Sequence, residues 1–152
     1  MNPSMEKRFM TSRALCLFIL CGIVFALCPP ALATDPQIEV KELVRTQNSW
    51  DGALLPAYPE GQPEIRILSI TVPHGEKLAI HRHPVINAGV LLSGHLRVHT
   101  TDGKVLDLLA GEAIVEVVNT WHWGESIGPD PAHIIVFYAG QTGIPVTVTP
   151  TE

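Results

Sequence analysis

The strongest constraint on this fold is a succession of short apolar runs separated by turn residues. The runs are rich in Val, Ile and Leu, and none continues as the long amphipathic pattern of a surface helix. Many short strands at close spacing are typical of an all-β sandwich or barrel. The expected strands are Ile38–Arg45, Ile65–Val72, Leu78–His83, Ala88–Leu92, His95–Thr100, Val105–Leu109, Ala113–Val118, His133–Ala139 and Val146–Thr149.

The connections between these runs carry Gly, Pro, Asn and Asp. Asp102-Gly103 predicts a hairpin with a type I′ turn, because both residue types tolerate the positive φ that this turn needs. The segment Asn48–Pro63 holds three prolines and predicts an ordered loop across the barrel surface. No internal repeat or linker interrupts the pattern, so we expect one domain over residues 34–152, with its core at 65–139.

The first 33 residues have the features of a secretory signal peptide. A basic start precedes the apolar run Ala14–Leu27, and Ala31-Leu32-Ala33 supplies the small residues after which signal peptidases cut. The alternative is a retained membrane anchor, but 14 apolar residues fall short of the roughly 20 that a spanning helix needs. We therefore expect cleavage after Ala33 and a periplasmic or secreted protein without stable membrane insertion.

Cleavage changes the chemistry that the chain has available. All three cysteines lie in the leader, so residues 34–152 contain neither a disulfide nor a thiolate ligand, but they keep all seven histidines. They also carry fourteen acidic and seven basic side chains, which argues against nucleic acid or an anionic membrane as the main partner. Any transition-metal role falls to histidine.

Three histidines in two stretches of chain form the candidate metal site. His81 and His83 stand two residues apart on an expected strand, so their side chains share one face about 6–7 Å apart and can converge on one cation. Asn87 returns toward the same point after a turn at Pro84, and His122 follows a second strand. Three histidine ligands that leave coordination positions of the metal open are typical of a catalytic metal rather than a structural one.

These two stretches resemble the motifs of the cupin superfamily. The first motif, G-x5-H-x-H-x3,4-E-x6-G, and the second, G-x5-P-x-G-x2-H-x3-N, are matched at Gly75, His81, His83, Gly94, Gly111 and His122. The resemblance covers Ile65–Ala139 and implies a jelly-roll-like antiparallel β-barrel. It also implies oxygenase or isomerase chemistry on a small oxygen-donor substrate, and a homodimer paired through the outer sheet.

The departures from the motifs bear on the charge of the site. Asn87 stands where the motif has a glutamate ligand. With neutral ligands only, a divalent ion would keep its full charge of +2 and would favour an anionic ligand from solution. The amide oxygen of Asn87 is expected to be a weaker fourth ligand. Glu116 is our candidate for the missing carboxylate or for a general base, because alternation can place it inward with Ile114 and Val118. The alternative register turns Glu116 to solvent. Three turn or packing positions also differ: Val117, Asn119 and Ser126.

The sequence leaves the function open between three classes. The first is a metal-dependent enzyme, the second a non-catalytic periplasmic module that binds or senses a metal or small ligand, and the third a structural barrel. Nitrogen and oxygen donors suit Fe, Mn, Ni, Cu, Co and Zn alike. The other polar or aromatic candidates are expected to lie outside the site or in packing positions: His74, His95, Arg97, His99, Trp121, Trp123 and His133, with Trp50 and Tyr58 open between packing and a pocket wall.

Overall fold

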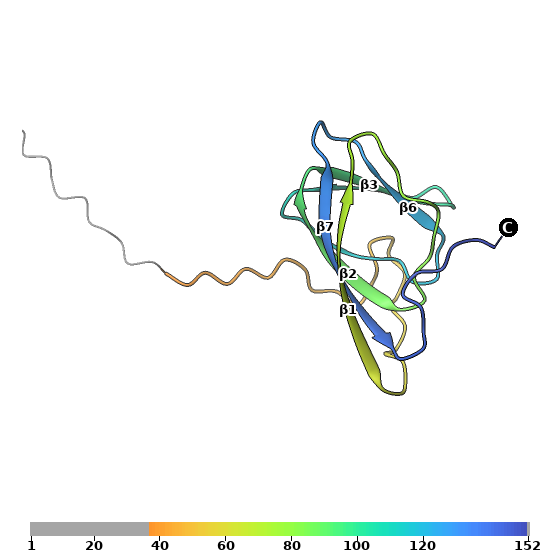
Figure 1. Cartoon of the computed structure of the whole chain (residues 1–152). Coiled ribbons are helices and arrows are strands. Elements are labelled where there is room, and N and C mark those ends of the chain that lie inside the picture. Colours follow the sequence, from red (N-terminus) through yellow and green to blue (C-terminus); the bar gives the residue numbers. More distant parts are fainter. Residues whose placement is uncertain (1–36, 152) are drawn as a thin grey trace, which may run out of the picture. The chain divides into compact units, whose positions relative to one another are not determined.

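A computed structural model describes residues 37–151, so the predicted signal peptide lies outside the described residues. The chain divides into two units between Glu39 and Val40, and all the strands belong to the second unit. Its regular elements within the described residues are all strands, which confirms the all-β prediction (Figure 1). Their bounds are β1 Pro63–Val72, β2 Ile86–Ser93, β3 His95–Thr100, β4 Val105–Leu109, β5 Ala113–Val115, β6 His122–Ser126 and β7 Ala132–Gln141.

The strands form two antiparallel sheets, one with the order β1-β7-β2-β5 and one with the order β4-β3-β6. Strand alternation gives each sheet an apolar inner face. On β7, for example, Ile134, Val136 and Tyr138 are buried, and each such side chain stabilises the fold by about 1.5–3 kcal/mol. The core between the sheets also holds Leu91, Leu96, Val98, Leu108 and Ile114.

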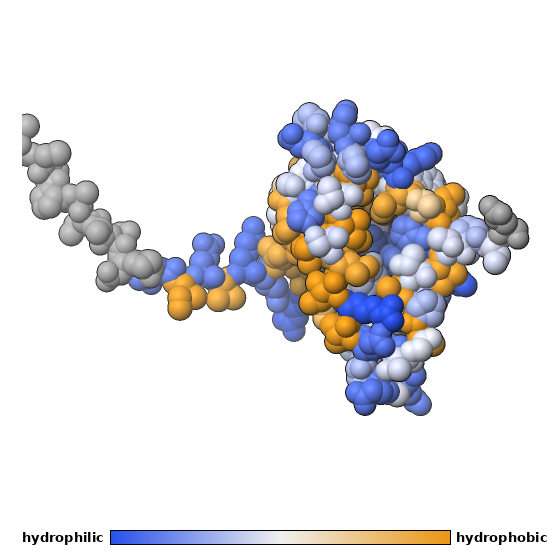
Figure 2. Space-filling view, viewed as in Figure 1, coloured by the Kyte–Doolittle hydropathy of each residue, from blue (hydrophilic) through white to orange (hydrophobic). Residues whose placement is uncertain are grey.

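The outer face of the four-stranded sheet is apolar as well. Ile65 and Ile67 of β1, Phe137 of β7 and Leu92 of β2 are all exposed, and Figure 2 shows apolar side chains gathered over this part of the molecule. A contiguous apolar patch of this kind typically marks an interaction surface. The face is covered only in part, along a shallow groove, by Leu43 and Val44 from the segment before β1.

Three predicted strands are wrong. Ile38–Arg45 makes no ladder with any described residue, and Ile38 and Val40 are more than 90% exposed. Leu78–His83 forms single bridges instead of a ladder, because its amides bond to different neighbours, the carbonyls of Gly124, His122 and Val148. Val146–Thr149 contributes one bridge, Arg82 with Val148.

One strand of the structure was not predicted, and another ends earlier than predicted. β6 was not expected because Gly124 interrupts its apolar pattern, and glycine weakens a strand signal. A Cβ at Gly124 would lie 3.3 Å from Leu96, so the glycine allows close packing of β6 against β3. β5 ends at Val115, three residues earlier than predicted.

The hairpin between β3 and β4 forms where predicted, but its turn is of another type. Gly103 has φ of 93°, whereas Asp102 is not among the residues with positive φ. The amide of Gly103 donates to Thr100 O over 3.1 Å and that of Thr100 to Lys104 O over 3.0 Å. This pattern is a three-residue loop with a left-handed glycine, so the type I′ prediction is wrong.

The loop predicted at Asn48–Pro63 is ordered and carries no strand before Pro63. In the described part of the chain, no helix has the length and apolar character needed to cross a membrane.

Candidate metal centre

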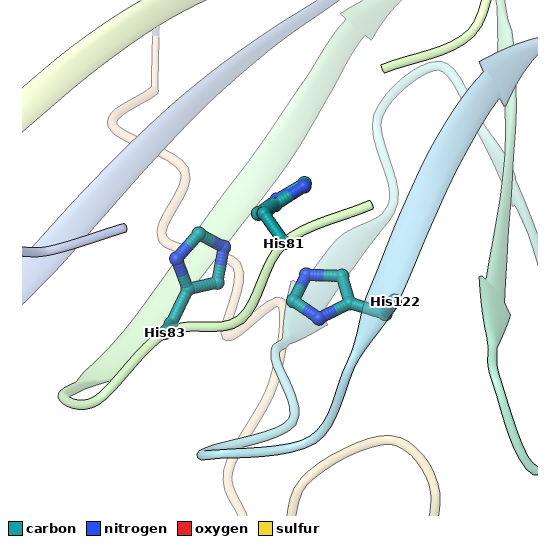
Figure 3. A group of neighbouring side chains, drawn as sticks. All are labelled: His81, His83 and His122. Carbon is teal, nitrogen blue, oxygen red and sulfur yellow. The ribbon is translucent and has the colours of Figure 1, made fainter. Parts of the chain in front are cut away.

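The fold brings His81, His83 and His122 together from the two stretches that the motifs identified (Figure 3). His81 and His122 are bridge partners with mutual backbone hydrogen bonds of 2.9 and 2.8 Å. His83 is tied to the same wall because Asn119 N donates to its carbonyl over 2.8 Å. One ring nitrogen from each histidine lies within 4.8 Å of the other two, as a shared ion requires.

The turn that carries this last hydrogen bond explains one departure from the family motif. Asn119 has φ of 58° and is the one non-glycine residue in the described chain with a positive φ. Asparagine tolerates the left-handed conformation better than other side chains, so it keeps the backbone shape for which the motif uses glycine.

Each imidazole is oriented by a backbone carbonyl. The Nδ1 atoms of His81, His83 and His122 lie 2.7, 2.7 and 2.8 Å from the carbonyl oxygens of Ala79, Val146 and Thr120. A carbonyl oxygen only accepts, so each Nδ1 carries the proton and donates it. Each Nε2 is therefore an unprotonated lone pair, which is the arrangement that metal-binding histidines use.

Burial keeps the three rings neutral. It lowers the pKa of His83 to about 3, and it lowers the pKa of His81 and of His122 as well. Neutral imidazole is the form that binds a metal, so no proton has to leave at neutral pH. His83 and His122 are buried, whereas His81 is partly exposed at the rim, which gives a ligand a side from which to approach.

The donor set fits a divalent transition metal. Three lone pairs that face one another without a donor between them repel, and a cation converts this repulsion into three bonds. Imidazole nitrogens suit Zn, Fe, Cu, Ni, Co and Mn, so the donors leave the identity of the metal undetermined. His81, His83 and His122 are the residues that would hold it.

Asn87 lies inside the same cavity with its amide unpaired. Its side chain is 1% exposed, and neither Nδ2 nor Oδ1 has a hydrogen-bond partner among the described residues. An unpaired buried amide costs about 1–3 kcal/mol. The cost is relieved if the amide binds a metal or a metal-bound ligand, which is a second observation in favour of an occupied site.

Glu116 faces inward, so the register that would expose it is excluded. It is 9% exposed, and its Oε2 atom lies 3.8 Å from Nε2 of His122. The same oxygen accepts hydrogen bonds from Trp50 Nε1 at 3.3 Å and from Val117 N at 3.2 Å. The carboxylate of Glu116 is not part of the cluster formed by the ring nitrogens of His81, His83 and His122, which lie within 4.8 Å of one another. Glu116 therefore lies beside the three histidines.

Burial raises the pKa of Glu116 to about 7, because the charged form loses hydration. A carboxyl group that exchanges its proton near neutral pH is suited to general acid–base chemistry.

The cavity that joins these groups is small and partly apolar. Its volume is about 40 Å³, enough for roughly three water molecules. Leu78, Leu96, Val98 and Val136 form part of the apolar wall, and Asn87, Glu116, Tyr138 and the three histidines supply the polar groups. The space therefore favours a ligand of few heavy atoms.

The other histidines lie away from this centre. His95, Arg97 and His99 alternate with the buried Leu96 and Val98, and they face acidic side chains on the outer surface, as expected. His74 is exposed in its turn, and His133 lies at the start of β7.

The tryptophans beside His122 point away from it. Trp123 stacks on His99 at 4.8 Å between ring centroids, and the Arg82 guanidinium lies 5.2 Å from the Trp121 ring. Both contacts lie outside the three-histidine cavity.

Two further residues lie at the site: Trp50, which the sequence left open between packing and a pocket wall, and Tyr138, which the sequence did not single out. Trp50 donates to Glu116 across 66 positions of sequence, a contact that no local pattern predicts. Tyr138 lies with its ring centroid 5.3 Å from that of His83. Strand alternation with Ile134 and Val136 was the available signal for its inward position.

Comparisons with known proteins agree with the fold. The family model described as cupin domain matches residues 68–138, and no curated protein matches the chain. A double-stranded β-helix protein from Klebsiella pneumoniae aligns with a TM-score of 0.50 and 19% identity, over 62% of this chain and 89% of that one.

Two solved enzyme structures align less completely. A DMSP lyase from Ruegeria pomeroyi aligns with a TM-score of 0.49 and 16% identity, over 56% of this chain and 42% of that chain. An oxalate decarboxylase from Lactobacillus farciminis has a TM-score of 0.49 and 18% identity, over 56% and 26%. This chain thus spans less than half the length of either enzyme.

Replacing Glu116 tests its burial as a carboxylate. A folded-state pKa raised from 4.5 to about 7 means that folding favours the protonated form, so its contribution to stability is lost as pH rises through 7. Glu116→Gln should therefore stabilise the metal-free protein by on the order of 2 kcal/mol at pH 8 and by much less at pH 5. Urea unfolding at the two pH values measures this, with the exposed Glu60→Gln as control. Equal effects at both pH values would contradict the burial of a charge.

Proposed function

We propose that this chain is an exported protein that binds one divalent transition metal through His81, His83 and His122. The premise is that residues 68–138 match the cupin domain family. One observation carries the proposal. The three Nδ1 protons are donated to backbone carbonyls, so three Nε2 lone pairs face a common point. The unpaired amide of Asn87 in the same cavity adds support, as a weak fourth ligand or as a donor to the ligand.

We further propose that the bound metal serves catalysis, as in an oxygenase or isomerase acting on a small oxygen-donor substrate. His81, His83 and His122 would hold the ion, which would supply Lewis-acid chemistry to a substrate oxygen. Glu116 then takes or returns a proton beside it, since its carboxylate lies 3.8 Å from a ligand histidine and is shielded from solvent. The apolar part of the cavity wall lowers the local polarity, which strengthens electrostatic interactions among these groups.

A non-catalytic module that binds or senses a metal or small ligand is the second candidate. Asn87 favours it, because the first motif's usual carboxylate is replaced by a neutral amide and three histidines alone leave the full charge on the ion.

Metal binding is tested by thermal unfolding and elemental analysis. Loading metal-free protein with Co(II) or Zn(II) at about 100 times the Kd should stabilise it by about 2.7 kcal/mol, with one ion per chain. His83→Ala removes a ligand and should abolish most of this gain. His99→Ala on the outer face is the matched control and should keep it. No gain in the unsubstituted protein would refute the proposal.

Turnover separates the two candidate functions. With a panel of small hydroxy and keto compounds, the metal-loaded enzyme should convert at least one, and Glu116→Gln should lower kcat by roughly 100-fold while keeping its metal. Product formation and oxygen uptake are the readouts. A ligand that stays bound through gel filtration and is never converted would favour the binding module instead.

Export rests on the leader sequence alone. The full chain produced in a bacterium with a Sec pathway should yield, in its periplasm or medium, a protein whose mass corresponds to residues 34–152. The mass of the intact chain in that fraction would argue against cleavage after Ala33.

The apolar outer sheet supports the expected homodimer. Ile65, Ile67, Phe137 and Leu92 form an exposed face to which a second copy could present the same surface. Sedimentation equilibrium should give the mass of two chains, and Ile67→Lys should give one. Val105 on β4 is exposed to a similar degree on the other sheet, so Val105→Lys should leave the dimer intact. A monomeric unsubstituted protein would refute this assembly.

A further inference from the structure

Two polar side chains in the cavity lie side by side without a hydrogen bond between them. The pairing of β2 with β5 places Ala88 opposite Val115, and Glu116 N donates to Asn87 O over 3.0 Å, so the same register continues to Asn87 and Glu116. Directly opposed residues have Cβ atoms about 5 Å apart and project to the same face. A carboxylate can accept a hydrogen bond from an amide in this relation, but the Asn87 amide has no partner among the described residues.

Two donors, one from the loop that precedes β1 and one from the chain after β5, explain why they do not pair. Trp50 Nε1 and Val117 N both donate to Oε2 of Glu116, at 3.3 and 3.2 Å. These two donors hold the carboxylate beside His122, whose Nε2 atom lies 3.8 Å away. One of the two carboxylate oxygens that could accept from the Asn87 amide is thus held beside His122.

Trp50 is itself fixed from three sides. Its own amide donates to Val115 O over 2.9 Å, and its ring packs against the core. The following turn is closed by Ser49 N, which donates to Ala53 O over 2.9 Å. Lys104 Nζ lies 2.9 Å from Asp51 O and 3.2 Å from Asp51 Oδ2, which attaches the turn to the β3–β4 hairpin.

We propose that Trp50 is a positioning residue of the metal centre. Its indole N–H keeps Glu116 turned toward the three-histidine site and away from Asn87, so that an acceptor and a donor both remain available to the ligand. The inference rests on the proposed metal-binding function. The ligand that satisfies both groups is a small protic oxygen compound, with a lone pair for the Asn87 amide and a proton for Glu116.

A double-mutant cycle tests whether Trp50 acts through Glu116. Trp50→Phe keeps an aromatic ring but removes the indole N–H together with the five-membered ring that carries it. Glu116→Met keeps the length of the side chain without a carboxylate. Trp50→Phe should weaken Co(II) binding roughly 10-fold in the parent chain, as expected for a residue that supports the ligand shell, and change the Co(II) absorption spectrum. In the Glu116→Met background the same substitution should change affinity by less than about twofold.

The control is Trp123→Phe, an identical substitution on the outer face, where the ring stacks on His99. It should leave both the affinity and the spectrum unchanged. An equal loss from Trp50→Phe in both backgrounds would overturn the inference, because it would show a general structural effect. So would a Trp50→Phe protein with unchanged affinity and spectrum.

The hydrogen bond from Trp50 to Glu116 is also tested in the metal-free protein, by thermal unfolding. Trp50→Phe should lower the Tm of the metal-free protein more in the parent chain than in the Glu116→Met background, and equal shifts would overturn the inference. This readout keeps the two proposals separate. A chain that binds no Co(II) refutes the metal-binding function, whereas Co(II) binding that is lost in His83→Ala and untouched in Trp50→Phe refutes the role of Trp50 alone.

Discussion

The site depends on three hydrogen bonds from imidazole Nδ1 atoms to backbone carbonyls. They fix the tautomer of each histidine and aim the opposite nitrogen at one point. Two of the carbonyls, of Ala79 and Thr120, lie two residues before the histidine that they orient. The third, of Val146, comes from the segment after β7, 63 positions from His83, so the closed fold is needed to complete the set.

The barrel supports this arrangement at a cost to its own stability. Three neutral rings, a free amide and a carboxyl group occupy a volume that apolar side chains would otherwise fill. Apolar burial on both sheets offsets the cost, with Leu91, Val98 and Ile114 almost wholly inaccessible to solvent. Polar groups retained inside such a core at this expense are typical of functional sites.

Much of the fold was predictable because its strands follow simple alternation. β1, β3, β4 and β7 were located to within a few residues. Prediction failed where backbone hydrogen bonds went to several partners, as in Leu78–His83, or where a glycine needed for close packing broke the pattern, as at Gly124 in β6. Neither condition is visible in a local window, because both depend on which strand lies next to which.

The sequence alone determined the candidate ligands. The spacing of His81 and His83, and the position of His122 after a second turn, identified the three histidines and the resemblance to the cupin motifs. Only the tertiary structure decided the inward direction of Glu116, the unpaired state of Asn87 and the contact from Trp50. Residue spacing fixes which side chains share a strand face. The orientation of a carboxyl group is set by donors that folding brings from distant parts of the chain, here an indole 66 positions away.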